Sequence, residues 1–232
     1  MSAKSSVSKK AAPAKALSPV DQFWALRLKT AKNFFEDNGY LVSLADSLEE
    51  ARDLALTAII PAFKPETLAF GGSQTVAQSG LVEALLNQQK IRVLETLNTG
   101  QNPETLYEQR RQAMTADLHV TSVNAATVDG KLVLLDGTGN RSAAVQFGPK
   151  NVLLFISRNK VTENLGEALT RTKAIAAPMN AMRLDRKTPC AKTGECENCD
   201  SPQRICNAWT IMDKCTRKHR IHIVLINQDA GF

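Results

Sequence analysis

Hydrophobic positions first repeat with helical spacing between Ser18 and Gly39. Ser18 precedes Pro19, and Asp21 follows in the first turn, an arrangement typical of a helix N-terminus. We expect this helix to end at Gly39, where glycine favours termination. Its apolar residues should form one stripe that faces the core, made of Phe23, Trp24, Leu28, Ala31, Phe34 and Phe35.

After this helix, short apolar runs alternate with helical stretches. The apolar runs predict strands at 40–44, 67–70, 91–94, 119–124, 152–157 and 220–226. The stretches between them predict helices at 47–60, 75–87, 103–116 and 163–176, with Pro178 ending the last one. Strands separated by helices of this length indicate an α/β fold with a mainly parallel sheet and helices on both faces.

Asp129-Gly130 interrupts the alternation, between the apolar runs 120–128 and 131–135. This dipeptide is typical of the tight turn in a β-hairpin. We therefore expect an antiparallel hairpin that joins the sheet at this point.

The length and composition indicate one main domain over 18–232. The chain has 232 residues, of which 43% are hydrophobic, enough for one sizeable core and too few for a second full domain. No stretch approaches the roughly 18 apolar residues of a membrane span, and no apolar segment follows the N-terminal lysines. The sequence therefore predicts a cytoplasmic protein without a membrane span.

The formal net charge of +6 is concentrated at the N-terminus. Lys4, Lys9, Lys10 and Lys15 have no acidic residue near them, and without these four lysines 25 basic residues remain against 23 acidic ones. Segment 1–17 is rich in Ser, Ala, Lys and Pro and buries too little apolar surface to offset its ordering entropy, so it is predicted to be disordered. A solvated basic tail is favoured over an arm for nucleic acid, and no nucleic-acid partner is expected.

All five cysteines lie within 26 residues of a chain that otherwise has none: Cys190, Cys196, Cys199, Cys206 and Cys215. In a reducing cytoplasm, thiols gathered this closely serve metal or redox chemistry more often than disulfides. Four thiolates complete the tetrahedral shell of zinc or the corners of an iron–sulfur cubane. We predict a metal-binding loop at about 183–218 whose ligands are Cys190, Cys196, Cys199 and Cys206, and leave the role of Cys215 open.

The cysteine spacing does not select the metal. The pattern C-x5-C-x2-C-x6-C contains one C-x2-C unit, whereas a zinc ribbon has two. Zinc and an iron–sulfur cluster both fit, and so does a loop of reduced cysteines packed as small hydrophobic residues. Lys192, Arg204 and Lys214 lie close enough in sequence to offset thiolate charge. His219 and His222 flank the cluster, but a histidine at a strand edge is more often structural than a ligand.

The segment FGGSQT at 70–75 joins a predicted strand to a predicted helix. Gly71 and Gly72 let the backbone approach a ligand, and Ser73 and Thr75 add hydroxyl groups that suit a small anion. No lysine follows, so the pattern is less specific than a Walker motif. Anion binding and a plain turn capped by Ser73 both fit.

A second polar loop, LDGTGNR at 135–141, lies just after the predicted hairpin. Arg141 is suited to bidentate contact with a carboxylate or phosphate, with Asn124, Gly139 and Asn140 around it. In the alternative interpretation, Asp136 and Arg141 pair with each other or cap neighbouring elements.

Motif chemistry assigns no catalytic residue. The sequence has no nucleophile elbow, no H-E-x-x-H and no complete Rossmann fingerprint. Glu95, just past a predicted strand, and Asp136 are the carboxylates nominated as acid or base groups.

Five separated blocks carry a resemblance to a known family: GGSQT, TSVNAATVDGKLVLLDGTGNR, FGPKNVLLFISRNKV, AAPMNAMRLDRKTPC and ENCDSPQRICN. Together they resemble the stand-alone, cysteine-bearing branch of the LUD domain, or lactate-utilization, family, over about residues 16–232. One departure is the ending Asn227-Gln228-Asp229-Ala230, where the family usually has an acidic residue followed by Leu-Gly and an aromatic residue.

The resemblance implies a fold similar to the ribose-5-phosphate isomerase, glucosamine-6-phosphate deaminase and CoA-transferase group, with ligands at the strand ends near a Gly-Ser-Thr loop. It assigns Gly71, Gly72, Ser73 and Thr75 to that loop and Asn124, Gly139, Asn140 and Arg141 to its polar rim. Some family members belong to operons for oxidation of L-lactate to pyruvate, beside iron–sulfur subunits.

The resemblance therefore implies oxidation of lactate or a related hydroxy acid through a small-anion site and a four-cysteine metal centre. The expected partners are a small anionic metabolite, iron–sulfur oxidoreductase subunits and a second copy in a homo-oligomer. An isomerase or transferase of a phosphorylated or CoA-linked substrate is one alternative, and a non-catalytic, zinc-stabilised interaction subunit is another. No reaction is settled for this branch, so whether the chain is an enzyme stays open.

Overall fold

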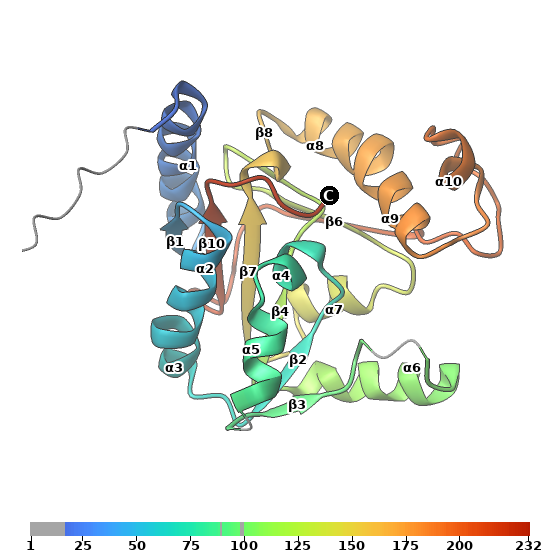
Figure 1. The fold of residues 1–232 in the computed structure, drawn as a ribbon, viewed down its shortest axis with the longest axis horizontal. Coiled ribbons are helices and arrows are strands. Elements are labelled where there is room, and N and C mark those ends of the chain that lie inside the picture. The colour runs from blue at the N-terminus through green and yellow to red at the C-terminus, as the bar shows by residue number, and fades with distance from the viewer. Residues whose placement is uncertain (1–16, 89, 98–99) are drawn as a thin grey trace, which may run out of the picture.

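The computed structural model describes residues 17–88, 90–97 and 100–232. Apart from Leu17, the tail expected at 1–17 lies outside these residues. The described chain forms a six-stranded parallel sheet in the order β1-β10-β7-β4-β2-β3, shown in Figure 1. Its strands are β1 (Leu41–Ala45), β10 (Ile221–Ile226), β7 (Asn151–Ser157), β4 (Leu118–Thr121), β2 (Thr67–Phe70) and β3 (Arg92–Leu94).

Helices cover both faces of this sheet, so the predicted α/β class is confirmed. Leu153 and Phe155 of β7 face one hydrophobic cluster, and Val152 and Leu154 face another, as the alternation along a strand requires. The first cluster includes residues of α2 (Leu48–Leu54), the π-helical turn η1 (Ala55–Ile59), α3 (Ile60–Phe63), α4 (Gln74–Gln78) and α5 (Leu81–Gln88). On the other face lie α1 (Pro19–Asp37), α6 (Pro103–Gln112) with the 3-10 turn η2 (Ala113–Thr115), and α7 (Asn140–Gln146).

The predicted hairpin is present, but it does not join the main sheet. Its strands β5 (Ala125–Thr127) and β6 (Leu132–Asp136) pair antiparallel and turn at Gly130, whose φ is 90°. They form a second sheet with β8 (Val161–Thr162) and β9 (Ala208–Met212), in the order β8-β5-β6-β9. The hairpin lies over one face of the main sheet because Leu132 and Leu134 pack into the same cluster as α1.

Two helix predictions were wrong in their bounds. Gly80, with φ of 76°, divides the helix expected at 75–87 into α4 and α5. Pro178 does not end a helix, because α8 (Leu165–Arg171) continues through the π-helical turn η4 (Thr172–Ala176) into α9 (Ala177–Arg183). Pro61 similarly lies just after the π-helical turn η1. Both prolines lack a backbone N–H, and in both cases the wider π-helical turn precedes the proline.

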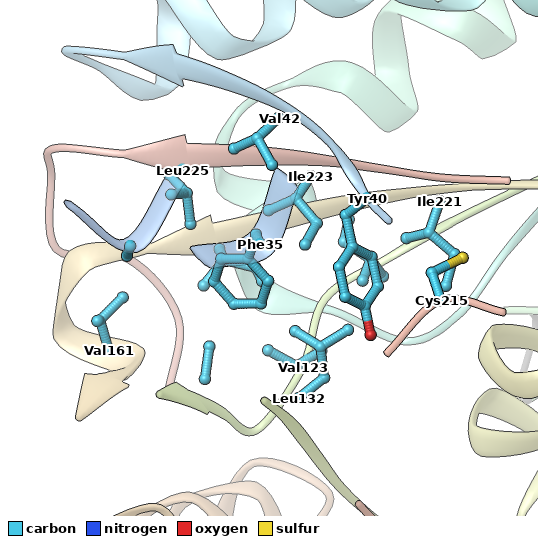
Figure 2. Packing of buried hydrophobic residues seen from close by; sticks show 14 of the residues in the cluster. Phe35, Tyr40, Val42, Val123, Leu132, Val161, Cys215, Ile221, Ile223 and Leu225 are labelled. Carbon is cyan, nitrogen blue, oxygen red and sulfur yellow. The ribbon is translucent and has the colours of Figure 1, made fainter. Parts of the chain in front are cut away.

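The stripe predicted on α1 is only partly buried. Leu28, Ala31 and Phe35 lie in the core, whereas Phe23 and Phe34 are 54% and 46% exposed. Cys215 is also a core residue, and Figure 2 shows it beside Tyr40 and Ile221, in the cluster that contains Phe35. Among the described helices, none has both the length and the hydropathy needed to cross a bilayer.

Candidate functional site

Polar residues gather where the parallel strands end. Gly71 follows β2, Ser122 follows β4, and the 3-10 turn η3 (Arg158–Lys160) follows β7. Because carboxyl ends of neighbouring parallel strands meet at one edge of the sheet, these segments lie together. Figure 1 shows the C-terminus at the same edge, where the β7 arrow ends.

Lys160 is a buried basic residue in this cluster, with 3% of its surface exposed. Its Nζ lies 3.0 Å from Oγ of Ser122 and 3.3 Å from the carbonyl oxygen of Val123. Burial, followed by the nearby charges of Arg171 and Arg141, lowers the pKa of Lys160 well below its ordinary value. The side chain is therefore shifted toward the neutral amine.

Arg141 reaches the cluster from α7 and pairs with Asp136. The guanidinium lies 2.8 Å from the Asp136 carboxylate and also donates to Oδ1 of Asn124. The other Asp136 oxygen accepts from N and Oγ of Ser142, at 2.6 and 2.7 Å. The predicted pairing of Asp136 with Arg141 is thus present, and Asp136 acts in this structure as a positioning group.

Arg171 reaches Asn124 from α8. It donates to the main-chain oxygens of Asn159 and Asn124, so Asn124 contacts two guanidinium groups. Burial lowers the pKa of Arg171 to about 10, which leaves it charged at neutral pH. Among the ion pairs of the described residues, none includes Arg171 or Lys160.

The Gly71–Thr75 loop makes structural contacts at this edge. A Cβ on Gly71 would lie 2.5 Å from Oγ1 of Thr121, so only glycine permits this close approach, whereas Gly72 is exposed with open space around it. Ser73 caps α4 by accepting from N of Val76 at 3.2 Å, as the turn interpretation predicted. Thr75 is fully buried.

The chain's last residues cover the cluster. The carbonyl oxygen of Ala230 accepts from Oγ1 of Thr75 at 3.2 Å and from Oγ of Ser157 at 2.6 Å. A Cβ on Gly231 would lie 2.6 Å from Oγ1 of Thr75 and 3.4 Å from Nζ of Lys160. Segment 230–231 therefore lies between the Gly71–Thr75 loop and the lysine.

Two buried side chains beside the cluster lack partners. Both ring nitrogens of His119 and Oγ1 of Thr121 are buried without a hydrogen bond, and both residues lie against Gly71. Burial, with smaller effects of Arg141 and Arg220, lowers the pKa of His119 to about 3, so its ring is neutral. Unpaired buried polar groups are costly, and in a native protein they call for an explanation such as a ligand or water.

The sequence analysis missed His119, Thr121, Lys160 and Arg171. His119 and Thr121 alternate with the apolar residues of β4, which is a usable signal for one polar face inside a buried strand. Nothing in the local sequence distinguishes Lys160 or Arg171 from basic residues on the surface.

The predicted residue Glu95 lies away from the strand-end cluster. It is exposed after the edge strand β3, where its carboxylate accepts from Gln101, and strands β2 and β4 lie between β3 and β7 in the sheet. The remaining rim residues Gly139 and Asn140 begin α7, where Gly139 is the N-cap residue with φ of 79°.

Four of the five cysteines line one cavity, and all five are free. Cys190, on α10 (Pro189–Thr193), shares the cavity with Cys196, Cys199 and Cys206. Its other walls are Ala177, Pro178, Ala181, Thr188, Glu197, Arg204 and Ile205. Figure 1 shows this cysteine-rich segment on the side of the molecule opposite α1.

Positive charge lies next to these thiols. Arg204 donates to the carbonyl oxygens of Cys199 and Cys206, at 2.6 and 3.2 Å. Nζ of Lys173 lies 3.7 Å from Sγ of Cys206. These two cations would offset the negative charge of thiolates that bind a metal here.

The four thiols are suitable metal ligands, but their sulfur atoms do not surround a common centre. Within the described residues, no three His, Cys, Asp or Glu side chains form a group that could hold an ion. His222 bonds to Oγ of Ser43 at 2.9 Å and His219 is exposed, and neither lines the cysteine cavity. Metal binding would therefore need the cysteine loop to close around the ion.

The fold and the strand-end cluster define an α/β protein whose candidate site lies at the carboxyl ends of a parallel sheet. The sequence pattern of the LUD domain matches residues 28–226, so the chain belongs to the LUD domain family. Among curated proteins, none matches the chain significantly in sequence.

One solved structure has a similar fold. A DUF162 family protein from Deinococcus radiodurans has a TM-score of 0.50 and 13% identity, over 88% of this chain and 97% of that one. This similarity concerns the fold alone. eIF2B delta from Chaetomium thermophilum has a TM-score of 0.30 and 17% identity, over 63% of this chain and 54% of that one.

Proposed function

We propose that the chain acts in the oxidation of lactate or a related hydroxy acid, binding a small carboxylate anion at the strand ends and a metal in the cysteine loop. One observation carries the anion site: Arg141, Lys160 and Arg171 converge at the strand ends with Asp136 as the carboxylate among them. Of these three, Arg171 stays charged and forms no ion pair within the described residues, and a buried charge without a counter-ion favours an anion. The five free thiols also fit a reducing cytoplasm as its compartment.

The strand-end groups suit a carboxylate with an oxygen on the neighbouring carbon. Arg171 and Arg141 supply positive charge, and the hydroxyls of Thr75, Ser157 and Ser122 supply hydrogen bonds. Ala230 now presents a carbonyl oxygen to two of these hydroxyls, as a carboxylate oxygen of a ligand would. A 2-hydroxy or 2-oxo acid such as lactate or pyruvate has these features.

A ligand panel tests the anion site. Thermal unfolding of the full chain is followed with lactate, pyruvate, inorganic phosphate, a sugar phosphate and a CoA thioester, since a ligand of the folded state raises the melting temperature. We expect lactate or pyruvate to stabilise the chain. A response to sugar phosphate or CoA thioester alone would instead support an isomerase or transferase and overturn the hydroxy-acid assignment.

Arg141→Ala provides the site-specific arm of this test. It should reduce the ligand-induced shift, because a hydrogen bond to a charged group contributes about 1.5–3 kcal/mol. Arg111→Ala is the matched control, since Arg111 is exposed and paired with Glu108 on α6. An equal shift in wild type and Arg141→Ala would remove Arg141 from the site.

The metal centre is supported by the donor set of Cys190, Cys196, Cys199 and Cys206 around one cavity, with Arg204 and Lys173 beside them. Bound there, zinc would brace the loop, whereas an iron–sulfur cluster would relay electrons. The chain's own residues would supply four thiolates and the cations that stabilise them.

Anaerobic purification followed by metal and sulfide analysis decides between these metals. Iron with labile sulfide and a broad visible absorption would support the electron relay, and stoichiometric zinc would support a braced interaction subunit. Metal-free protein that binds neither zinc nor a reconstituted cluster would overturn the metal centre. Cys215→Ala is the control that should leave metal content unchanged.

A further inference from the structure

We propose that Lys160 forms a reversible imine with the ketone carbon of a 2-oxo acid bound at the strand ends. The inference rests on the small-anion site proposed above and names its substrate class more closely. It also gives Lys160 a chemical role that neither the fold nor the family match assigns.

The amine is held without a counter-ion. Nζ contacts two oxygens, Oγ of Ser122 and the carbonyl of Val123, and no ion pair of the described residues includes it. A surface lysine keeps its proton and is a poor nucleophile, whereas an amine placed in a desolvated site or beside another cation is activated. Lys160 meets both conditions.

The charges facing the amine come from three elements. Arg171 on α8 and Arg141 on α7 both oppose its protonation, while Asp136 on β6 is bound to Arg141 and Ser142. Buried His119 on β4 is a neutral ring. The same two guanidiniums, whose charges add to the effect of burial in lowering the pKa of Lys160, would attract the carboxylate of a 2-oxo acid.

Segment 230–231 marks where the substrate fits. A single carbon added to Gly231 would touch both Oγ1 of Thr75 and Nζ of Lys160, so a small molecule replacing this segment reaches both groups. The Ala230 carbonyl takes hydrogen bonds from Thr75 and Ser157 that a carboxylate oxygen would accept. The ketone next to that carboxylate would then lie against the amine, once the segment has moved aside.

The reaction balances without an oxidant. The Lys160 nitrogen adds to the ketone carbon, and the carbinolamine that forms passes its remaining N–H proton to the departing oxygen. One C=N bond replaces the C=O bond, and the oxygen leaves as water with both amine protons. Added cyanoborohydride reduces the imine to a stable secondary amine.

Reductive trapping tests the imine on the full chain. The protein is incubated with pyruvate and cyanoborohydride at neutral pH, and modified lysines are located by peptide mass spectrometry. Lys150 is the internal reference, because it is exposed and its hydrogen bond with Asp117 raises its pKa. We expect Lys160 to be labelled at least about tenfold faster than Lys150, since only the unprotonated amine reacts.

Unmodified Lys160, or labelling no faster than that of Lys150, overturns the imine. Lys160→Met should remove the site-specific label and stay folded, because methionine fills the space of the lysine stem. Thermal shifts separate the two proposals. Pyruvate that stabilises the chain without labelling Lys160 overturns the imine alone, whereas pyruvate that does neither contradicts the anion site as well.

Discussion

The main-chain N–H of Asn207 donates to the carbonyl oxygen of Asp136 at 2.8 Å, which joins the cysteine loop to the strand-end cluster. Cys206 directly precedes Asn207, and the carboxylate of Asp136 binds Arg141. Nδ2 of Asn207 donates to the next carbonyl, that of Gly137, at 3.1 Å. Asn207 and Asp136 therefore link Cys206 to Arg141. A movement of the cysteine loop around a metal would shift Arg141 through these two residues.

Arg204→Ala should weaken metal binding. Arg204 joins the main chain at Cys199 and Cys206 and supplies positive charge, so its loss leaves both segments less ordered. Groups that orient metal ligands typically change affinity by about 10–100-fold, and we expect a loss in this range. Zinc competition with a chromophoric chelator measures it. Arg186→Ala, which removes an exposed arginine outside the cavity, is the control, and equal affinities would contradict the role of Arg204.

Thiol titration of the metal-free chain should show four fast cysteines and one slow one. Cys215 is 6% exposed, its Sγ donates to the carbonyl of Arg217, and burial raises its pKa, so little reactive thiolate is present. The four cysteines of the cavity are partly exposed, so the reagent reaches their sulfur atoms directly. The reaction of the chain with a disulfide reagent is followed over time, and its slow phase should be absent in Cys215→Ala. Five similar rates in the folded protein would contradict this packing.

Asp117 should stabilise the fold in a pH-dependent way. Its carboxylate accepts from Lys150 and from Oγ1 and N of Thr67, which together hold its pKa below the ordinary value of 3.8. A lowered folded-state pKa gives stability that is complete above about pH 4 and is lost as the pH falls further. Asp117→Asn should therefore lower the free energy of unfolding at neutral pH by about 1–3 kcal/mol.

The difference between wild type and Asp117→Asn, measured by denaturant unfolding, should shrink as the pH falls below about 4. Asp185→Asn is the control, because Asp185 is exposed and pairs with a single lysine, Lys187. A difference that stays constant with pH would show that the Asp117 charge does not contribute.

Gly130→Ala should destabilise the chain more than Gly194→Ala. Both glycines have positive φ, 90° and 81°, so both substitutions carry about 1–2 kcal/mol of backbone strain. A Cβ on Gly130 would also lie 2.6 Å from Nδ2 of Asn38 and 3.1 Å from the carbonyl oxygen of Phe34, whereas Gly194 has open space. Thermal unfolding should rank the variants in this order, and the reverse order would show that the hairpin turn does not pack on α1.

The main sheet could be predicted from sequence because its strands are short apolar runs that alternate with helices. The cap at Ser18 and the turn at Gly130 were also readable, since each depends on residues adjacent in sequence. The second sheet could not be found in this way. Its β9 contains Trp209 and Ile211, both more than 40% exposed, and takes its place only through pairing with β6, far away in sequence.

The candidate site was predicted only in part, for a related reason. Glycines and hydroxyls near a turn carry a local signal, and so do clustered cysteines. Lys160 gains its properties from burial beneath segment 230–231 and from Arg171 and Arg141, which are distant in sequence. Such an environment exists only once the chain has folded.

Isothermal titration of pyruvate into the full chain tests the strand-end anion site most directly. We expect saturable binding at one site per chain, weakened roughly tenfold or more in Lys160→Met and unchanged in Lys150→Met, because only Lys160 lies in the cluster. No saturable binding to the wild type, or equal binding by wild type and Lys160→Met, would contradict the account.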